Sequence, residues 1–163
     1  MRTELTQPAG ELIQPAGLLA RPQSFVVSSE SRRQVIDITR QVRECVFDSG
    51  VADGMVLVNV LHTTCSMIIA ETDDRTSHDF FGLMSRFIED GAPYRHNDPR
   101  WSDCERGNAA AHLRASLLAH GVAVAIAGGE LALEESQAIL LAEWDGPRSR
   151  TVNIQILGAD SAQ

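Results

Sequence analysis

An apolar run at residues 55–61 constrains the fold more than any other part of this sequence. Val56, Val58 and Val60 alternate along it, so they share one face of an extended chain, and His62 continues that face. The valines predict a strand packed against a core, whereas an imidazole at the end of the row is not what a core needs. We therefore expect this strand to lead into a polar site.

Further short apolar segments predict a sheet. Strands are expected at residues 24–28, 65–70, 121–127, 130–133, 137–144 and 150–156, with turns at 128–129 and 145–147. Three helices are expected. The first begins at the capping-box sequence 31–34, the second follows the acidic run 71–74, where Asp73 or Asp74 could cap its N-terminus, and the third is a short helix around His112. The predicted fold class is α+β, with a mixed, largely antiparallel, sheet-rich core and inserted helices.

The length of 163 residues fits one domain. The tetrapeptide Gln-Pro-Ala-Gly occurs at residues 7–10 and again at 14–17, where its Pro and Gly interrupt any regular pattern. We expect residues 1–22 to be a disordered leader and residues 23–160 to form the folded domain.

Composition excludes several classes of function. The net charge of −8 argues against a nucleic-acid partner, and all 14 basic residues are arginine, which excludes a Schiff-base lysine and a P-loop. Three cysteines without a Cys-x-x-Cys spacing argue against a disulfide framework, so we expect the reducing cytoplasm. No apolar run has the length of a membrane span, so no membrane partner is expected.

Three histidines could converge on one site. His62 ends the valine row, His96 lies in the polar segment 91–107, and His112 follows Asn108 by four residues, which places both on one face of a helix. Three neutral imidazoles suit a divalent transition metal such as zinc. The spacing matches no compact metal motif, however, so each could instead be a hydrogen-bonded structural histidine.

Arginines and carboxylates near the turns are the remaining candidates. Arg148 follows a tight turn and Arg95 neighbours His96, and the planar guanidinium suits phosphate. Arg148 could instead be a solvated side chain paired with Glu143 or Asp145. Carboxylates could hold magnesium or orient the imidazoles. Cys65 is expected to pack in the interior, and Cys104 to be an exposed loop thiol.

These residues, taken in order, resemble the YjbQ family, also described as the secondary thiamine-phosphate synthase family. The resemblance covers roughly residues 24–158 and rests on the following set: His62-Thr-Thr64, Glu71, Asp74, Asp79, Tyr94-Arg-His96, Gly107-Asn108, His112, Gln137 and Glu143-x-Asp-Gly-Pro-Arg148. Two positions depart from the family pattern, because Ser136 replaces a usual Trp and Ala70 a usual Asn. The resemblance implies a trimer-forming α+β fold and a polar pocket near a subunit interface.

The resemblance also implies roles for individual residues. The expected catalytic residues are Glu71, Asp79, Gln137 and Glu143; the expected substrate-binding residues are Thr63, Thr64, Arg95, Asn108 and Arg148; the expected metal ligands are His62, His96 and His112. The expected cofactor is a divalent metal, zinc or magnesium. The implied activity joins a pyrimidine pyrophosphate to a thiazole phosphate. Alternatives are another metal-dependent enzyme, or a non-catalytic homotrimer that binds a small phosphorylated or anionic metabolite.

Overall fold

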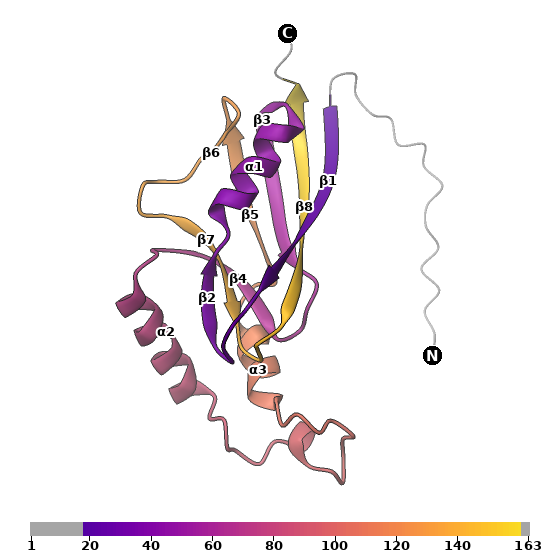
Figure 1. Ribbon diagram of the computed structural model, residues 1–163, viewed down its shortest axis with the longest axis vertical. Helices are drawn as coiled ribbons and strands as arrows, with labels where there is room; N and C mark the ends of the chain where they lie inside the picture. Colours follow the sequence, from indigo (N-terminus) through magenta and orange to yellow (C-terminus); the bar gives the residue numbers. More distant parts are fainter. Residues whose placement is uncertain (1–17, 161–163) are drawn as a thin grey trace, which may run out of the picture.

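The computed structural model describes residues 18–160, and its elements follow one another as Figure 1 shows. In chain order they are β1 (Leu18–Ser28), β2 (Gln34–Asp37), α1 (Thr39–Ser49), β3 (Val51–Val60), β4 (Cys65–Ala70), α2 (Asp74–Phe87), the 3₁₀ turn η1 (Arg95–Asn97), α3 (Ala109–Leu117), β5 (Gly121–Ala127), β6 (Glu130–Leu131), β7 (Ala138–Glu143) and β8 (Ser149–Asp160). The predicted α+β class, with helices inserted into a sheet-rich chain, is confirmed.

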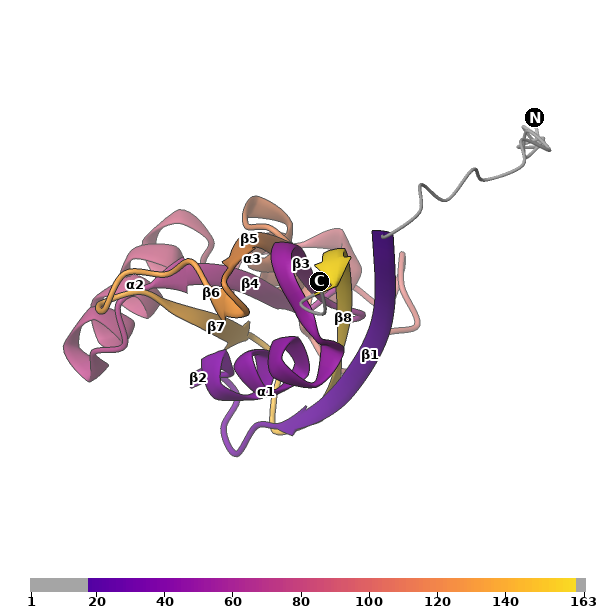
Figure 2. The same cartoon turned by 90° about the horizontal axis from the view of Figure 1, so that it is seen from above.

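The strands form two sheets. One has the order β1-β8-β3-β5-β6 and the other the order β2-β7-β4, and every pairing between the described strands is antiparallel. Figure 2, which looks down on the molecule, shows α1 in front of the two sheets, between β2 and β8. The hydrophobic core therefore lies between the sheets and is closed on one side by α1.

The valine row of β3 faces this core as predicted. Val56, Val58 and Val60 are almost fully buried, and β8 adds inward-facing residues from the neighbouring strand, with Val60 opposite Val152 in the register. β7 contributes Ile139 from the other sheet. Because successive residues of a strand point to opposite faces, the alternation read from the sequence fixes which side of each strand is apolar.

A second apolar cluster lies at the end of the molecule opposite the start of β1 and the end of β8, where Figure 1 shows α2 and α3. Trp144, just after β7, packs there against Phe80 and Phe81 of α2, with ring centroids 5.5 and 5.3 Å away. The cap of α2 is as expected, since the Asp73 side chain accepts hydrogen bonds from the first backbone amides of this helix. None of the helices within residues 18–160 combines the length and apolar composition that a membrane crossing requires.

The helix expected to begin at the capping-box sequence starts later, so that prediction was wrong. Gln34–Asp37 is the strand β2, paired with β7, and α1 begins at Thr39. The Gln34 side chain accepts a hydrogen bond from the amide of Glu30, and Asp37 instead accepts from the Thr39 amide. In a helix at 31–37 the backbone N–H and C=O groups would hydrogen-bond within the helix, whereas in β2 they hydrogen-bond to the buried strand β7. The tertiary contact with β7 therefore outweighs the local helix preference.

The first described strand begins inside the segment expected to be a leader. β1 starts at Leu18, which pairs with Ala159 at the far end of β8. Residues 18–22, which lie before the expected domain boundary, thus belong to a strand. Both Gln-Pro-Ala-Gly repeats lie outside the described residues.

Candidate functional site

Two of the three candidate histidines meet at the end of the molecule where α3 begins. The rings of His96, in η1, and His112, in α3, lie edge to face with centroids 5.0 Å apart. His96 Nε2 is 3.2 Å from the Asn108 Oδ1 atom, and the Thr63 backbone hydrogen-bonds to His112. Burial and the neighbouring His96 lower the pKa of His112, so this imidazole is neutral at pH 7.

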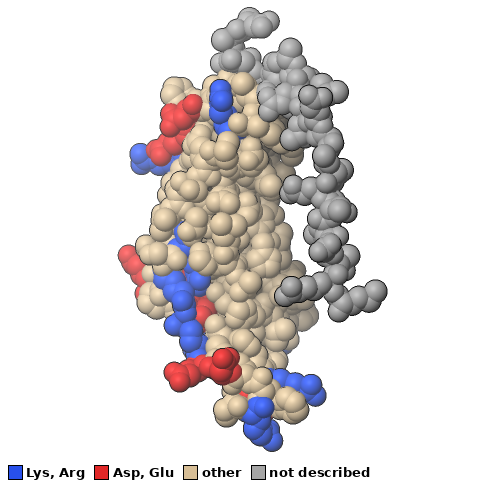
Figure 3. Space-filling model, turned by 90° about the vertical axis from the view of Figure 1, so that its right-hand side faces the viewer, with Lys and Arg blue, Asp and Glu red and all other residues tan. Residues whose placement is uncertain are grey.

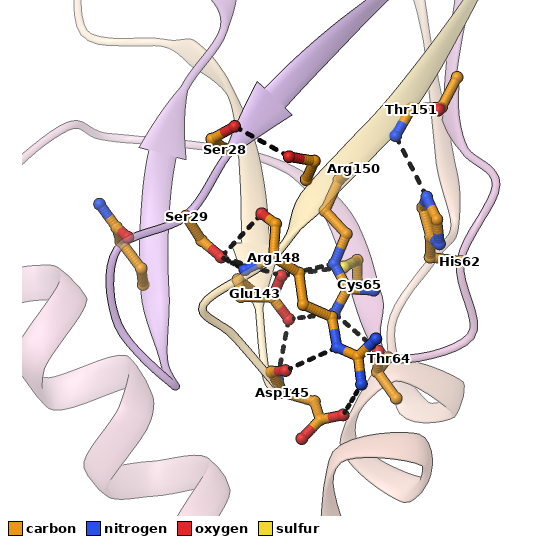
Figure 4. A network of polar contacts seen from close by, with 12 residues as sticks. Ser28, Ser29, His62, Thr64, Cys65, Glu143, Asp145, Arg148, Arg150 and Thr151 are labelled. Carbon is orange, nitrogen blue, oxygen red and sulfur yellow. Dashed lines mark hydrogen bonds and ion pairs between the residues drawn. The ribbon is translucent and has the colours of Figure 1, made fainter.

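His62 lies apart from this pair and hydrogen-bonds to the backbone of β8. Its Nε2 atom accepts a hydrogen bond of 3.1 Å from the Thr151 amide of β8, and Figure 4 shows it apart from the ion pairs of the β7–β8 turn. Burial and the charge of Arg150 lower the pKa of His62. The neutral ring therefore extends the hydrogen bonding between β3 and β8 beyond the last strand residue, which is the structural alternative that the sequence left open.

These positions bear on the expected metal. Within residues 18–160, no three His, Cys, Asp or Glu side chains are grouped so that they could hold a metal ion. His96 and His112 supply at most a pair of nitrogen ligands, and His62 Nε2 is occupied by the Thr151 amide. The side chains of residues 18–160 therefore do not fit a three-histidine zinc or magnesium site, and a bound metal stays a prediction.

Asp145 joins the histidine pair to two arginines. Its buried carboxylate accepts hydrogen bonds from Asn108 Nδ2 at 2.9 Å and Arg106 Nε at 3.1 Å, and Arg148 Nη2 lies 3.6 Å away. Burial alone raises the pKa of Asp145, but the hydrogen bonds from Asn108 and Arg106 outweigh it and hold that pKa below its usual value. One carboxylate thus faces two guanidinium groups, both partly open to solvent, and this group of residues carries a net positive charge.

Behind this layer lies a buried ion pair, drawn in Figure 4. Arg150 donates to both carboxylate oxygens of Glu143 at 2.6 Å, and its Nη2 atom also donates to Thr64 Oγ1 at 3.0 Å. Glu143 accepts further hydrogen bonds from the Asp145 amide at 2.8 Å and from Ser29 Oγ at 3.3 Å. Because Glu143 is enclosed by protein atoms, it would act by fixing the Asp145 turn and not by touching a ligand.

The two cysteines outside α1 differ from each other. Cys65 is fully buried, as expected, and burial together with the charge of Glu143 raises the pKa of its thiol to about 12, which makes it unreactive. Cys104, expected to be an exposed loop thiol, is half-buried and its Sγ atom donates to Asn108 Oδ1 at 3.4 Å. Cys104 therefore lies at the edge of the histidine pair.

Three of the remaining expected site residues lie away from these contacts, and the fourth, Arg95, lies next to His96 in η1. Glu71 is exposed after β4, and the side chain of Asp79 is 88% exposed on α2. Gln137 Oε1 accepts from the Glu134 amide and so stabilises its own loop. Arg95 lies over the ring of Trp101, with its guanidinium carbon 5.2 Å from the ring centroid. Within the described residues, no hydrogen bond or ion pair connects the first three of these to the histidine pair.

Sequence reasoning missed Arg106 and Arg150. Arg150 shares the inward face of β8 with Val152 and Ile154, so it ends an apolar row in the same way that His62 does in β3. That pattern could have identified it. Arg106 gave no signal beyond its place just before Gly107-Asn108.

Comparison with known protein families shows which family this chain belongs to. The family model of UPF0047 proteins, YjbQ-like, matches residues 23–159. The chain belongs to the YjbQ/UPF0047 family. The family resemblance found in the motifs is thereby confirmed, and it spans almost the whole described structure.

Individual YjbQ/UPF0047 proteins agree with this placement. A UPF0047 protein of Archaeoglobus fulgidus is 38% identical over 131 residues, which cover 80% of this chain and 97% of that protein. The UPF0047 protein YugU of Bacillus subtilis is 33% identical over 132 residues, covering 81% and 96%. A YbjQ-like protein of unknown function from Sulfolobus solfataricus P2 superimposes with a TM-score of 0.80 at 30% identity, covering 86% and 99%.

Proposed function

We propose that the residues around Asp145 bind a small phosphorylated metabolite. The observation that carries this proposal is the pair Arg106 and Arg148, two partly solvent-exposed guanidinium groups held by one buried carboxylate. Because a single aspartate cannot neutralise both, the surface keeps a positive charge that suits phosphate oxygens. His112 and Asn108 add neutral hydrogen-bonding groups beside it.

The reaction proposed for this site is of the thiamine-phosphate synthase type. The ring nitrogen of a thiazole phosphate attacks the methylene carbon of a pyrimidine pyrophosphate, a carbon–nitrogen bond forms, and the carbon–oxygen bond to pyrophosphate breaks. The electron pair of that bond leaves with the pyrophosphate, and the thiazole becomes a thiazolium cation. No proton is transferred in this step, so the protein needs to align the two rings and to stabilise negative charge on the leaving group.

The arginines and histidines divide these tasks. Arg106 and Arg148 would take the leaving pyrophosphate, whose oxygens gain charge in the transition state. His112, kept neutral by its lowered pKa, would hold a ring by hydrogen bonding without adding charge beside the cationic product. None of these residue roles depends on a metal ion bound to the protein.

A homotrimer is part of the same proposal, and the outer face of the larger sheet is the surface that suits it. Exposed Met55 and Leu57 of β3 lie beside exposed Leu157 of β8 on this face. Figure 3, which views the molecule from the side of β1, shows charged side chains near its margins and an uncharged centre. Leu57→Arg should dissociate the assembly in light scattering, whereas Leu83→Arg, equally exposed on α2, should not.

The test is product formation by the purified chain. Wild type, Arg106→Gln and Arg40→Gln are supplied with both phosphorylated precursors and Mg²⁺, and thiamine phosphate is measured. All hydrogen bonds of Arg106 within the described residues go to Asp145, whereas Arg40 pairs with Glu44 on the solvent side of α1. Losing a charged hydrogen bond should lower kcat/KM of Arg106→Gln about ten- to a hundredfold, and Arg40→Gln should match wild type.

Two results would count against the proposal. If wild type forms no product, the chain is not a transferase of this type. Tight binding of either precursor without turnover would then indicate a non-catalytic metabolite-binding protein. If Arg106→Gln and Arg40→Gln are equally active, the reaction does not use the arginines around Asp145.

A further inference from the structure

A cavity of about 420 Å³ lies against the histidine pair. It is lined by Tyr94, Arg95, His96, Ala109, His112 and Leu113. Tyr94 and His96 come from the segment around η1, whereas Ala109 and Leu113 come from α3. The cavity therefore lies between two elements that the Asn108 side chain and the His96 ring already connect.

The walls of this cavity are suited to a flat ring. Its lining combines two imidazoles and a phenol ring with the apolar side chains of Ala109 and Leu113, and Arg95 is the one charged residue among them. The His96 and His112 rings are nearly perpendicular, with an interplanar angle of 79°, so one presents a face where the other presents an edge. Aromatic ligands prefer such stacked and edge-on partners, and the imidazole nitrogens can hydrogen-bond to heteroatoms of the ring.

One cation lies at the border of the cavity. The Arg95 side chain is exposed, and its guanidinium lies over the Trp101 ring, which limits the directions in which it can point. A guanidinium so oriented can donate to phosphate oxygens of a ligand whose ring lies in the cavity. The carboxylate of Asp145, whose charge acts on His112, is already paired with Arg106, Arg148 and Asn108.

We propose that this cavity is a recognition site for a planar heteroaromatic ring that carries a phosphate or pyrophosphate substituent, with Leu113 and Tyr94 contacting the ring and Arg95 the anion. The proposal rests on the proposed function and adds to it the place where one of the two rings binds. It assigns Leu113 and Tyr94 to binding, roles that neither residue type nor spacing had indicated.

The test measures binding without turnover. The pyrimidine pyrophosphate alone and inorganic pyrophosphate alone are titrated calorimetrically into wild type, Leu113→Ser and Leu117→Ser. Leu117 is the matched control because it lies one turn further along α3, is 63% exposed and does not line the cavity. Both substitutions replace an exposed leucine, so neither should impair folding.

Leu113→Ser should weaken binding of the pyrimidine pyrophosphate about tenfold and leave that of inorganic pyrophosphate within twofold. Leu117→Ser should change neither. A third variant, Arg95→Gln, should weaken both ligands, since it removes one of the guanidinium groups that contact the anion, with Arg106 and Arg148 retained.

Two outcomes overturn the proposal. In the first, wild type binds the ring-bearing and the ringless pyrophosphate equally well. In the second, Leu113→Ser and Leu117→Ser bind the pyrimidine compound alike. The result is independent of catalysis: selective binding that Leu113→Ser abolishes supports the ring site even where no thiamine phosphate forms. Where wild type forms thiamine phosphate but either of the two outcomes is found, the ring site is refuted and the transferase stands.

Discussion

Replacing Arg150 by methionine should show how much the buried ion pair stabilises the fold. The substitution keeps an unbranched apolar side chain and removes the guanidinium that gives Glu143 two hydrogen bonds of 2.6 Å. The side chains of Glu143 and Arg150 are 0% and 4% exposed, so the remaining carboxylate has no access to water. Breaking a buried pair by removing one partner costs about 3–5 kcal/mol.

The lower part of that range is expected here. Glu143 keeps hydrogen bonds from the Asp145 amide and Ser29 Oγ, which still offset part of the buried charge. The hydroxyl of Thr64 loses its donor, which adds a smaller cost. We therefore expect Arg150→Met to lower the free energy of unfolding by about 3 kcal/mol at pH 7.

The dependence on pH gives a sharper test. In wild type, burial alone raises the pKa of Glu143, but the hydrogen bonds from Arg150 outweigh it, so the pKa is below its usual value. A carboxyl with a lowered pKa stabilises the fold above its unfolded-state pKa, and that contribution is lost as the pH falls through the folded-state value. Without Arg150, burial prevails and raises the pKa. On acidification toward pH 5 the buried Glu143 of Arg150→Met should take up a proton and lose its unpaired charge, whereas wild type keeps its ion pair, so the difference between them should shrink.

Urea unfolding at one fixed protein concentration, followed by the fluorescence of buried Trp144, measures both quantities at pH 7 and pH 5. Arg40→Met is the control, because the pair of Arg40 with Glu44 is solvent-exposed and its loss should leave the midpoint unchanged. A loss below about 1 kcal/mol for Arg150→Met, or a loss that does not depend on pH, would refute the assignment of a structural ion pair.

Three other outcomes follow from the geometry. The lowered pKa of His112 means that the unfolded chain takes up a proton first, so stability should fall as the pH drops below the ordinary histidine pKa, and His112→Gln should flatten that part of the urea-midpoint profile. Nitrogen NMR shifts should show His62 Nε2 unprotonated at pH 7, because it accepts from Thr151; a protonated Nε2 would contradict that hydrogen bond. Gly82→Ala, with open space around its Cβ within α2, should raise the free energy of unfolding by about 0.5–1 kcal/mol, whereas Gly146→Ala, whose Cβ would lie 2.6 Å from a buried hydroxyl, should lower it; equal calorimetric melting temperatures would exclude both.

The strands could be predicted from the sequence because alternation is a local property. The valine row of β3, the Gly128-Gly129 turn and the apolar strand β7 all lie where periodicity placed them. The segment at 31–37 could not be predicted in this way. Its capping-box spacing is a real local preference, but β7 offers a pairing partner more than a hundred residues away, and a sequence window contains no information about that partner.

In the candidate site, too, local contacts could be predicted from the sequence and long-range contacts could not. His96, Asn108 and His112 could be grouped because helical spacing and one loop connect them. Their connection to Arg106 depends on Asp145, which enters from the β7–β8 turn. Contacts between turns of different strands arise from the packing of whole sheets, so motif spacing alone could not reveal them.

One pattern in the strands does predict where the site forms. The inward-facing rows of β3, β7 and β8 each end in an ionisable residue: His62, Glu143 and Arg150. β3 and β8 are antiparallel, so the end of the first lies beside the start of the second, and Glu143 reaches Arg150 from the other sheet. The core therefore ends in a layer of fixed charges and hydrogen bonds, and the residues around Asp145 are built on that layer. Substitutions in it should alter the geometry of the proposed ligand site, because Glu143 fixes the Asp145 turn by accepting from its amide.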